Sequence, residues 1–183
     1  MNKTPPAIHV CSLSRLHETV SNSGASHIVT LINAGTPVER PAHIAEDRHL
    51  FLGLNDIVSP LDGMTLPGAE HVERLIDFAQ GWDRSAPMVV HCWAGISRST
   101  AGGFIAACAL NPHRDPDEIA KTLRKAAPSA TPNALLVDLA DQILERGGAM
   151  SEAIRSIGRG QSAFEGEPFV LELHDAPDEE SNT

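Results

Sequence analysis

The chain has 183 residues, of which 42% are hydrophobic and 21% charged, so it can bury the core of one globular domain. Its formal net charge of −10 argues against nucleic acid and anionic membranes as partners. The amino-terminal residues lack the apolar region of a signal peptide, and no apolar run has the length of a membrane span. The three cysteines do not suit a disulfide framework, so we expect a reducing, cytoplasmic setting.

Short apolar runs alternate with segments of helical periodicity along most of the chain. The strand-like runs are rich in β-branched residues and are bounded by residues that favour turns. They cover residues 8–13, 27–32, 49–54 and 88–91. Helices are predicted where apolar residues recur at three- to four-residue spacing. They cover residues 14–21, 68–80, 98–110, 116–126, 132–146 and 150–160.

Strands separated by helices, with apolar residues on both faces, predict an α/β fold. We expect a central, mainly parallel sheet of four to five strands, flanked by helices on both faces. Thr131 is the predicted N-cap of the helix over 132–146, with Pro132 at its first position. Residues 1–160 are expected to form one domain, and 161–183 an acidic tail that is partly disordered, chiefly over 176–183.

The most informative segment joins the predicted strand at 88–91 to the predicted helix at 98–110. It contains His91 and Cys92, then five residues, then Arg98 and Ser99. Ligands of open α/β sheets bind at the carboxyl ends of the strands. There, successive backbone N–H groups and the start of a helix attract anions. We therefore expect phosphate or sulfate to occupy this loop.

Each residue type in the loop suits phosphate chemistry. A cysteine thiol such as that of Cys92 ionises more readily at a helix start beside a guanidinium and is then a nucleophile. Arg98 offers a planar fork that can hold two phosphoryl oxygens. Gly95 permits turn dihedral angles that other residues avoid, and the Ser99 hydroxyl can donate to the sulfur. The predicted phosphate-binding residues are Trp93, Ala94, Gly95, Ile96, Ser97 and Arg98.

The segment His91–Ser99 resembles the signature of the cysteine-based protein tyrosine phosphatase superfamily, in its compact dual-specificity-like branch. His49–Asp56 and Thr131–Asn133 also fall in that family's order, so the resemblance spans about residues 8 to 146. It implies a sheet flanked by helices and a two-step displacement through a cysteinyl-phosphate, with no metal or other cofactor. It also implies that an Asp on a loop before the Cys is the general acid. Asp56 fits this position, with Asp62 as the alternative, although Asp56 could also merely cap a loop.

Other residues allow a functional and a structural interpretation. His91 could tune the thiolate or fix the loop backbone, and Asn133 could face the site or simply start a helix. We expect Trp93 to point away and pack, although it could instead form a wall for a flat substrate. Cys11 and Cys108 are expected to be small buried apolar groups, without excluding a redox role, and the histidines lack the spacing of metal ligands.

The sequence predicts a phosphomonoester hydrolase, a protein tyrosine or dual-specificity phosphatase, acting on phosphorylated proteins or small phosphomonoesters. Because the loop has no basic residue between Cys92 and Arg98, inositol lipids are less favoured substrates. The alternatives are a catalytically silent module that binds phosphorylated partners, and a sulfurtransferase- or arsenate-reductase-like thiol enzyme. The sequence does not indicate an oligomeric state.

Overall fold

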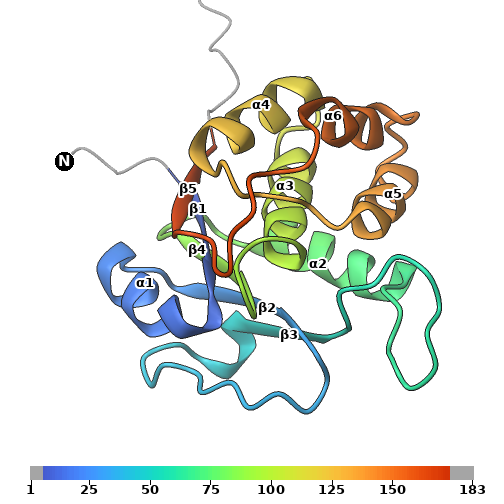
Figure 1. Cartoon of the computed structure of the whole chain (residues 1–183). Coiled ribbons are helices and arrows are strands. Elements are labelled where there is room, and N and C mark those ends of the chain that lie inside the picture. The colour runs from blue at the N-terminus through green and yellow to red at the C-terminus, as the bar shows by residue number, and fades with distance from the viewer. Residues whose placement is uncertain (1–5, 174–183) are drawn as a thin grey trace, which may run out of the picture.

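Five strands form one mixed sheet in the computed structural model, which describes residues 6–173 (Figure 1). The strand order is β3-β2-β4-β1-β5, and only β5 runs antiparallel to its neighbour. The strands are β1 (Ala7–Ser12), β2 (His27–Ile32), β3 (His49–Gly53), β4 (Met88–Cys92) and β5 (Phe169–Glu172). The helices are α1 (Leu16–Ser23), α2 (Ala69–Gly81), α3 (Arg98–Leu110), α4 (Pro116–Ala126), α5 (Ala134–Ile143) and α6 (Ala149–Ile157), with short 3₁₀ turns at Leu13–Arg15 and Glu46–Arg48. The predicted fold class, a mainly parallel sheet between helices, is confirmed.

Apolar side chains cover both faces of the sheet, because successive apolar residues along a strand point to opposite faces. Ile28 of β2 and Val89 of β4 pack with α1 in a smaller core. Their neighbours Val29 and Val90 lie in the larger core under the other helices. At its centre is α3, buried along its whole length, since its Ala and Gly residues let it lie close to the sheet. Within residues 6–173, no helix has the length and apolarity to cross a bilayer.

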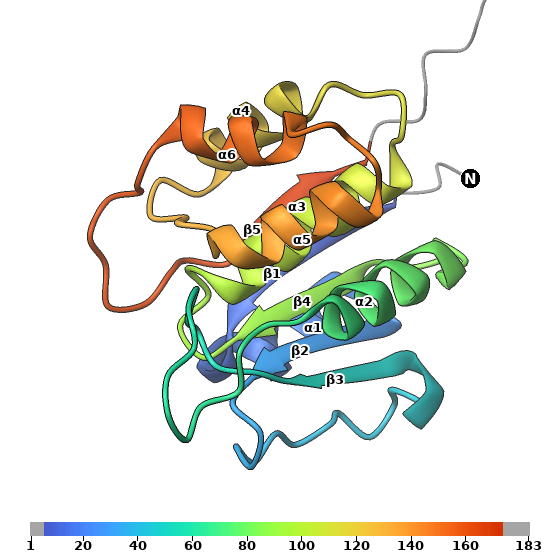
Figure 2. The same ribbon diagram turned by 90° about the vertical axis from the view of Figure 1, so that its right-hand side faces the viewer.

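The parallel register brings the carboxyl ends of four strands to one edge. Ser12 at the end of β1 is opposite Cys92 at the end of β4, and Ile32 of β2 is opposite Gly53 of β3. Figure 2 shows three segments along this edge: the loop after β4, the loop after β3, and the connection from α6 to β5. The edge is where the sequence predicted a ligand site.

The helices agree with the predicted segments, and the largest difference is at α5. The predicted cap Thr131 is wrong, because α5 begins at Ala134 and its N-cap is Asn133, whose side chain accepts from the Leu136 N–H at 3.1 Å. Thr131 instead accepts a hydrogen bond from the Gly160 N–H through its hydroxyl at 3.1 Å. The start of α5 is therefore displaced by two residues from the predicted one.

The chain after residue 160 contains a strand that the sequence analysis did not predict. Phe169–Glu172 pairs with β1, and Phe169 and Leu171 are buried in the larger core. The alternation in this strand is short and lies among acidic residues, so it is a weak signal, and the strand depends on pairing with β1 and on packing in the core. Packing therefore continues beyond the predicted domain boundary at 160. The disorder predicted for 176–183 lies outside the described residues.

Candidate active site

The loop from Trp93 to Ser97 joins the end of β4 to the start of α3. Four of its carbonyl oxygens are turned outward, because backbone N–H groups from three other segments donate hydrogen bonds to them. These bonds are Leu13 N–H to Trp93 at 3.1 Å, Gly166 to Ala94 at 2.8 Å, Thr131 to Ile96 at 2.9 Å and Asn133 to Ser97 at 3.2 Å. The N–H of a trans peptide points opposite to its C=O. Fixing these carbonyls therefore directs several N–H groups to the inner side of the loop.

Gly95 shows which side that is. Its N–H donates to the Cys92 sulfur at 3.3 Å, so the inner side of the loop is the side of the sulfur. Gly95 has φ of 72°, and a Cβ at this position would lie 2.8 Å from the backbone nitrogen of Ser12. Both the turn and the close approach to β1 require a residue without a side chain. The predicted role of Gly95 in the turn is confirmed.

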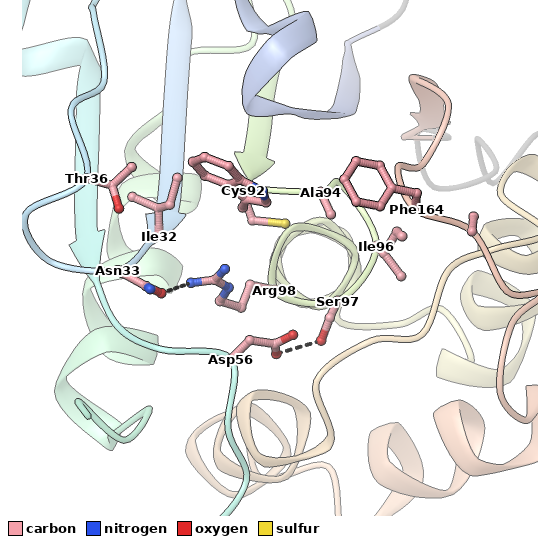
Figure 3. Close-up of a pocket in the computed structure, with 12 residues that line it drawn as sticks. Ile32, Asn33, Thr36, Asp56, Cys92, Ala94, Ile96, Ser97, Arg98 and Phe164 are labelled. Atoms are coloured by element: carbon pink, nitrogen blue, oxygen red, sulfur yellow. Dashed lines mark hydrogen bonds between the residues drawn. The ribbon is translucent and has the colours of Figure 1, made fainter. Parts of the chain in front are cut away.

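Cys92 borders a cavity of about 650 Å³ at the sheet edge (Figure 3). Its Sγ lies 3.1 Å from the Ser99 hydroxyl, which comes from the first turn of α3. The start of α3 adds N–H groups that have no partner within the helix, together with positive potential. The loop therefore combines a sulfur with several donors, an arrangement that can stabilise a thiolate and bind a tetrahedral oxyanion.

Arg98 is buried and has its guanidinium held in one orientation. One terminal nitrogen, Nη1, donates to Asn33 Oδ1 at 2.8 Å and to the Leu54 carbonyl at 2.9 Å. Its Nε is also buried, and within residues 6–173 no group accepts its hydrogen. A buried donor without an acceptor is costly, and an anion in the cavity would satisfy it. Arg98 thus fits the predicted binding of phosphoryl oxygens.

Asp56 lies on the same cavity, whereas the alternative Asp62 is an exposed turn residue that does not line it. Asp56 Oδ1 accepts hydrogen bonds from the Ser97 hydroxyl at 2.7 Å and from Asn133 Nδ2 at 2.9 Å. Both bonds converge on Oδ1, which fixes the orientation of the carboxyl group. Asn133 combines both of its predicted interpretations, because it caps α5 and also faces the site.

His91 is fully buried and belongs to a chain of hydrogen bonds across three strands. Its Nδ1 lies 3.2 Å from the Cys92 carbonyl, which can only accept, so Nδ1 carries the hydrogen. Its Nε2 then accepts from the Thr30 hydroxyl at 2.7 Å, and Thr30 accepts from His49 Nε2 at 2.8 Å. Burial lowers the pKa of His91 to about 4 and also lowers that of His49, so both rings are neutral at pH 7. This geometry favours the backbone-fixing interpretation of His91.

Acid is expected to destabilise the protein through His91. The unfolded imidazole binds a proton below about pH 6.5, whereas the native one does so only below about pH 4, so stability falls as the pH decreases between these values. We expect this residue to account for about 3 kcal/mol of unfolding free energy between pH 7.5 and 4. Urea unfolding of His91→Gln should show a shallower pH dependence than wild type. Some pH dependence should remain, because His9, His27, His49 and His71 keep their lowered pKa values. Replacing exposed His43 by Gln is the control; an unchanged slope in His91→Gln would contradict the assignment.

The structure corrects the expectation for Trp93 and confirms the burial expected for Cys11 and Cys108. Trp93 does not pack away from the site, because its side chain is 60% exposed and lines the cavity. Cys11 and Cys108 are both buried, as predicted, and burial raises the pKa of their thiols to about 11 and about 12.

Several residues of the site were not predicted from the sequence. Asn33 follows the end of β2 at the same edge as Cys92, so the rule that located the loop could also have found it. Thr30 and His49 lie in strands, and no motif in the sequence indicates their hydrogen-bonded chain to His91. Ala163 and Phe164 line the cavity from the connection between α6 and β5, and nothing in the sequence places that segment at the site.

The chain is similar in structure to known phosphatases. No protein-family model matches the sequence, and the comparison with curated proteins finds no match. Human DUSP28 superposes with a TM-score of 0.59 at 18% identity, covering 80% of this chain and 97% of that one. The Cydia pomonella PTP-2 phosphatase gives 0.58 at 17% identity, covering 76% and 90%. A mouse putative dual-specificity phosphatase complexed with zinc tungstate gives 0.56 at 18%, covering 84% and 94%. The chain therefore has the fold of the compact dual-specificity and protein tyrosine phosphatases.

Proposed function

We propose that the protein is a cysteine-dependent phosphomonoester hydrolase of the protein tyrosine or dual-specificity phosphatase type. The observation that carries the proposal is that Cys92 and the buried Arg98 line one cavity, with the Gly95 N–H directed at the sulfur and, among residues 6–173, no acceptor for the Arg98 Nε hydrogen. The tungstate complex of the mouse protein of this fold is consistent with it, because tungstate is a tetrahedral oxyanion like phosphate. A thiolate nucleophile also needs a reducing setting, such as the cytoplasm.

In the first step, the Cys92 thiolate attacks phosphorus while the P–O bond to the leaving group breaks. Arg98 and the loop N–H groups hold the three equatorial oxygens, whose charge is spread in the transition state. Asp56 gives its proton to the departing oxygen. The products are a cysteinyl-phosphate on Cys92, the free alcohol or phenol, and an ionised Asp56.

In the second step, Asp56 takes a proton from a water molecule, and the water oxygen attacks phosphorus. The S–P bond breaks, inorganic phosphate leaves, and Cys92 returns to the thiolate. Ser99 assists this step by donating to the sulfur, from which it lies 3.1 Å. Asp56 ends protonated again, so the cycle closes without an external acid or base.

The substrates we propose are phosphotyrosine-containing proteins, with phosphoserine and phosphothreonine in a dual-specificity enzyme, or small phosphomonoesters. The first test is hydrolysis of an aryl phosphate in the presence of a metal chelator. Undiminished turnover supports the proposal. Binding of a phosphopeptide without hydrolysis would support the silent module instead, and sulfur transfer from thiosulfate would support the sulfurtransferase.

The variant Asp56→Asn should lose the contribution of a general acid to turnover. We expect kcat to fall on the order of 10²- to 10³-fold, because an amide cannot give a proton to the leaving oxygen. The pH dependence of kcat should then lack its decrease at high pH. Asp62→Asn is the matched control and should behave like wild type. If Asp62→Asn shows the larger loss, the two aspartates have been assigned in the wrong order.

A further inference from the structure

The segment from Gly158 to Gly166, which links α6 to β5, runs along the mouth of the cavity; we call it the strap. It is anchored at both ends. At its start, the Gln161 N–H donates to the Pro128 carbonyl at 2.9 Å, and Arg124 donates to the Gly158 carbonyl at 2.8 Å. At its end, the Gly166 N–H donates to the Ala94 carbonyl of the phosphate-binding loop at 2.8 Å. The strap is thus fixed directly to the candidate active site.

The anchor at the end of the strap is closely fitted. Gly166 is buried, and a Cβ there would lie 2.6 Å from the Gly95 carbonyl oxygen, so the strap and the loop touch through their backbones. The adjacent Glu165 carboxylate accepts hydrogen bonds from the hydroxyls of Ser12 and Ser14. These bonds lower the pKa of Glu165, which keeps it charged at neutral pH. The residue before it, Phe164, therefore has a defined position.

Phe164 is 95% exposed, although it is held beside fixed residues. It lines the cavity of Cys92 and Arg98, on the other side from Asn33 and Thr36 (Figure 3). Together with Trp93 it also borders an adjoining groove of about 270 Å³, whose remaining lining includes Leu13 and Ala94. Within residues 6–173, these two rings are the exposed aromatic side chains that border the cavity.

We propose that Phe164 and Trp93 form a clamp that binds the aromatic ring of an aryl phosphate whose phosphoryl group lies on the loop. The inference rests on the proposed function and adds a specificity element carried by the strap. Both side chains line the same cavity as Cys92, which places them where the organic group of a bound phosphate can contact them. A flat ring gains contact area and favourable aromatic geometry there. The short aliphatic stem of phosphoserine offers much less surface to both rings.

Binding separates this inference from the proposed function, because it does not require turnover. Calorimetry on Cys92→Ser would compare phenyl phosphate with inorganic phosphate, alone and combined with Phe164→Ala or Trp93→Ala. We expect each aromatic substitution to weaken phenyl phosphate on the order of 5- to 10-fold, with inorganic phosphate changed by less than about twofold for Phe164→Ala. The double substitution should be less than additive if both rings contact one ligand. The control is Phe51→Ala, another exposed aromatic, 37% exposed on β3 and away from the cavity.

Kinetics on the active enzyme give the second readout. Phe164→Ala should raise KM for p-nitrophenyl phosphate and reduce the preference for phosphotyrosine over phosphoserine peptides. In the calorimetry, equal affinities for phenyl phosphate with and without Phe164→Ala would overturn the clamp. So would an equal loss for inorganic phosphate, which would show that Phe164 acts only through the loop. If the wild-type protein binds phenyl phosphate without hydrolysing it, and Phe164→Ala weakens that binding, the proposed function is refuted and the clamp stands.

Discussion

Replacing Cys92 by Ser is expected to lower kcat for an aryl phosphate by at least about 10⁴-fold, because a hydroxyl is a far weaker nucleophile than a thiolate. The loop N–H groups and Arg98 remain in place, so binding of inorganic phosphate should persist. Steady-state kinetics and calorimetry on the same preparation would measure both quantities. Loss of turnover with retained binding is the combination that identifies a nucleophile.

Cys108→Ala provides the matched control for that experiment. Cys108 is buried in α3 among alanines and lies outside the cavity, so this variant should keep wild-type turnover. Full activity of Cys92→Ser would eliminate Cys92 as the nucleophile. Loss of activity in both variants would point instead to a general effect of cysteine replacement on the fold.

Arg98→Lys should reduce kcat/KM on the order of 10²- to 10³-fold, even though the charge is kept. The Arg98 fork uses Nη1 to contact Asn33 and the Leu54 carbonyl, and no residue among 6–173 accepts from Nε or Nη2, so these two nitrogens can hold the anion. A lysine ammonium has one nitrogen and cannot serve both sides at once. The loss should be apparent in kcat as well as in KM, since charge on the phosphoryl oxygens is stabilised in the transition state.

The control for Arg98→Lys is Arg155→Lys on the exposed surface of α6, which should change nothing measurable. Thermal unfolding of both variants would show whether the buried substitution also weakens the fold. If Arg98→Lys retains kcat/KM within about fivefold of wild type, bidentate binding by Arg98 is wrong.

The four parallel strands and the phosphate-binding loop could be predicted because their signals are local. The buried β-branched runs, Gly95 in its turn and the Cys92-to-Arg98 spacing each express a constraint within a dozen residues. The resemblance implied an Asp on a loop before the Cys, and the rule that ligands bind at carboxyl ends of parallel strands favoured Asp56, which lines the same cavity as Cys92. The start of α5 was harder, because Thr131 and Asn133 are both good caps and contacts with distant residues, including Asp56, hold Asn133 in place.

The unpredicted features depend on contacts between distant segments. The strand β5 is stable only because β1 lies beside it, and Phe164 reaches the site only because the strap returns from α6. Trp93 is exposed because it lines the open cavity rather than a packed interface. None of these has a motif of its own, and the alternation in β5 is short, since each feature is set by tertiary packing.

The central claim is that the Cys92 sulfur becomes bonded to phosphorus during turnover. Rapid acid quenching during hydrolysis of an aryl phosphate, followed by mass spectrometry of the digested protein, tests it most directly. We predict a transient phosphoryl group on the peptide that contains Cys92, lost when substrate is exhausted and absent from Cys92→Ser. A phosphoryl group on a histidine or serine, or steady turnover with no phosphorylated Cys92 at any time point, would contradict this mechanism.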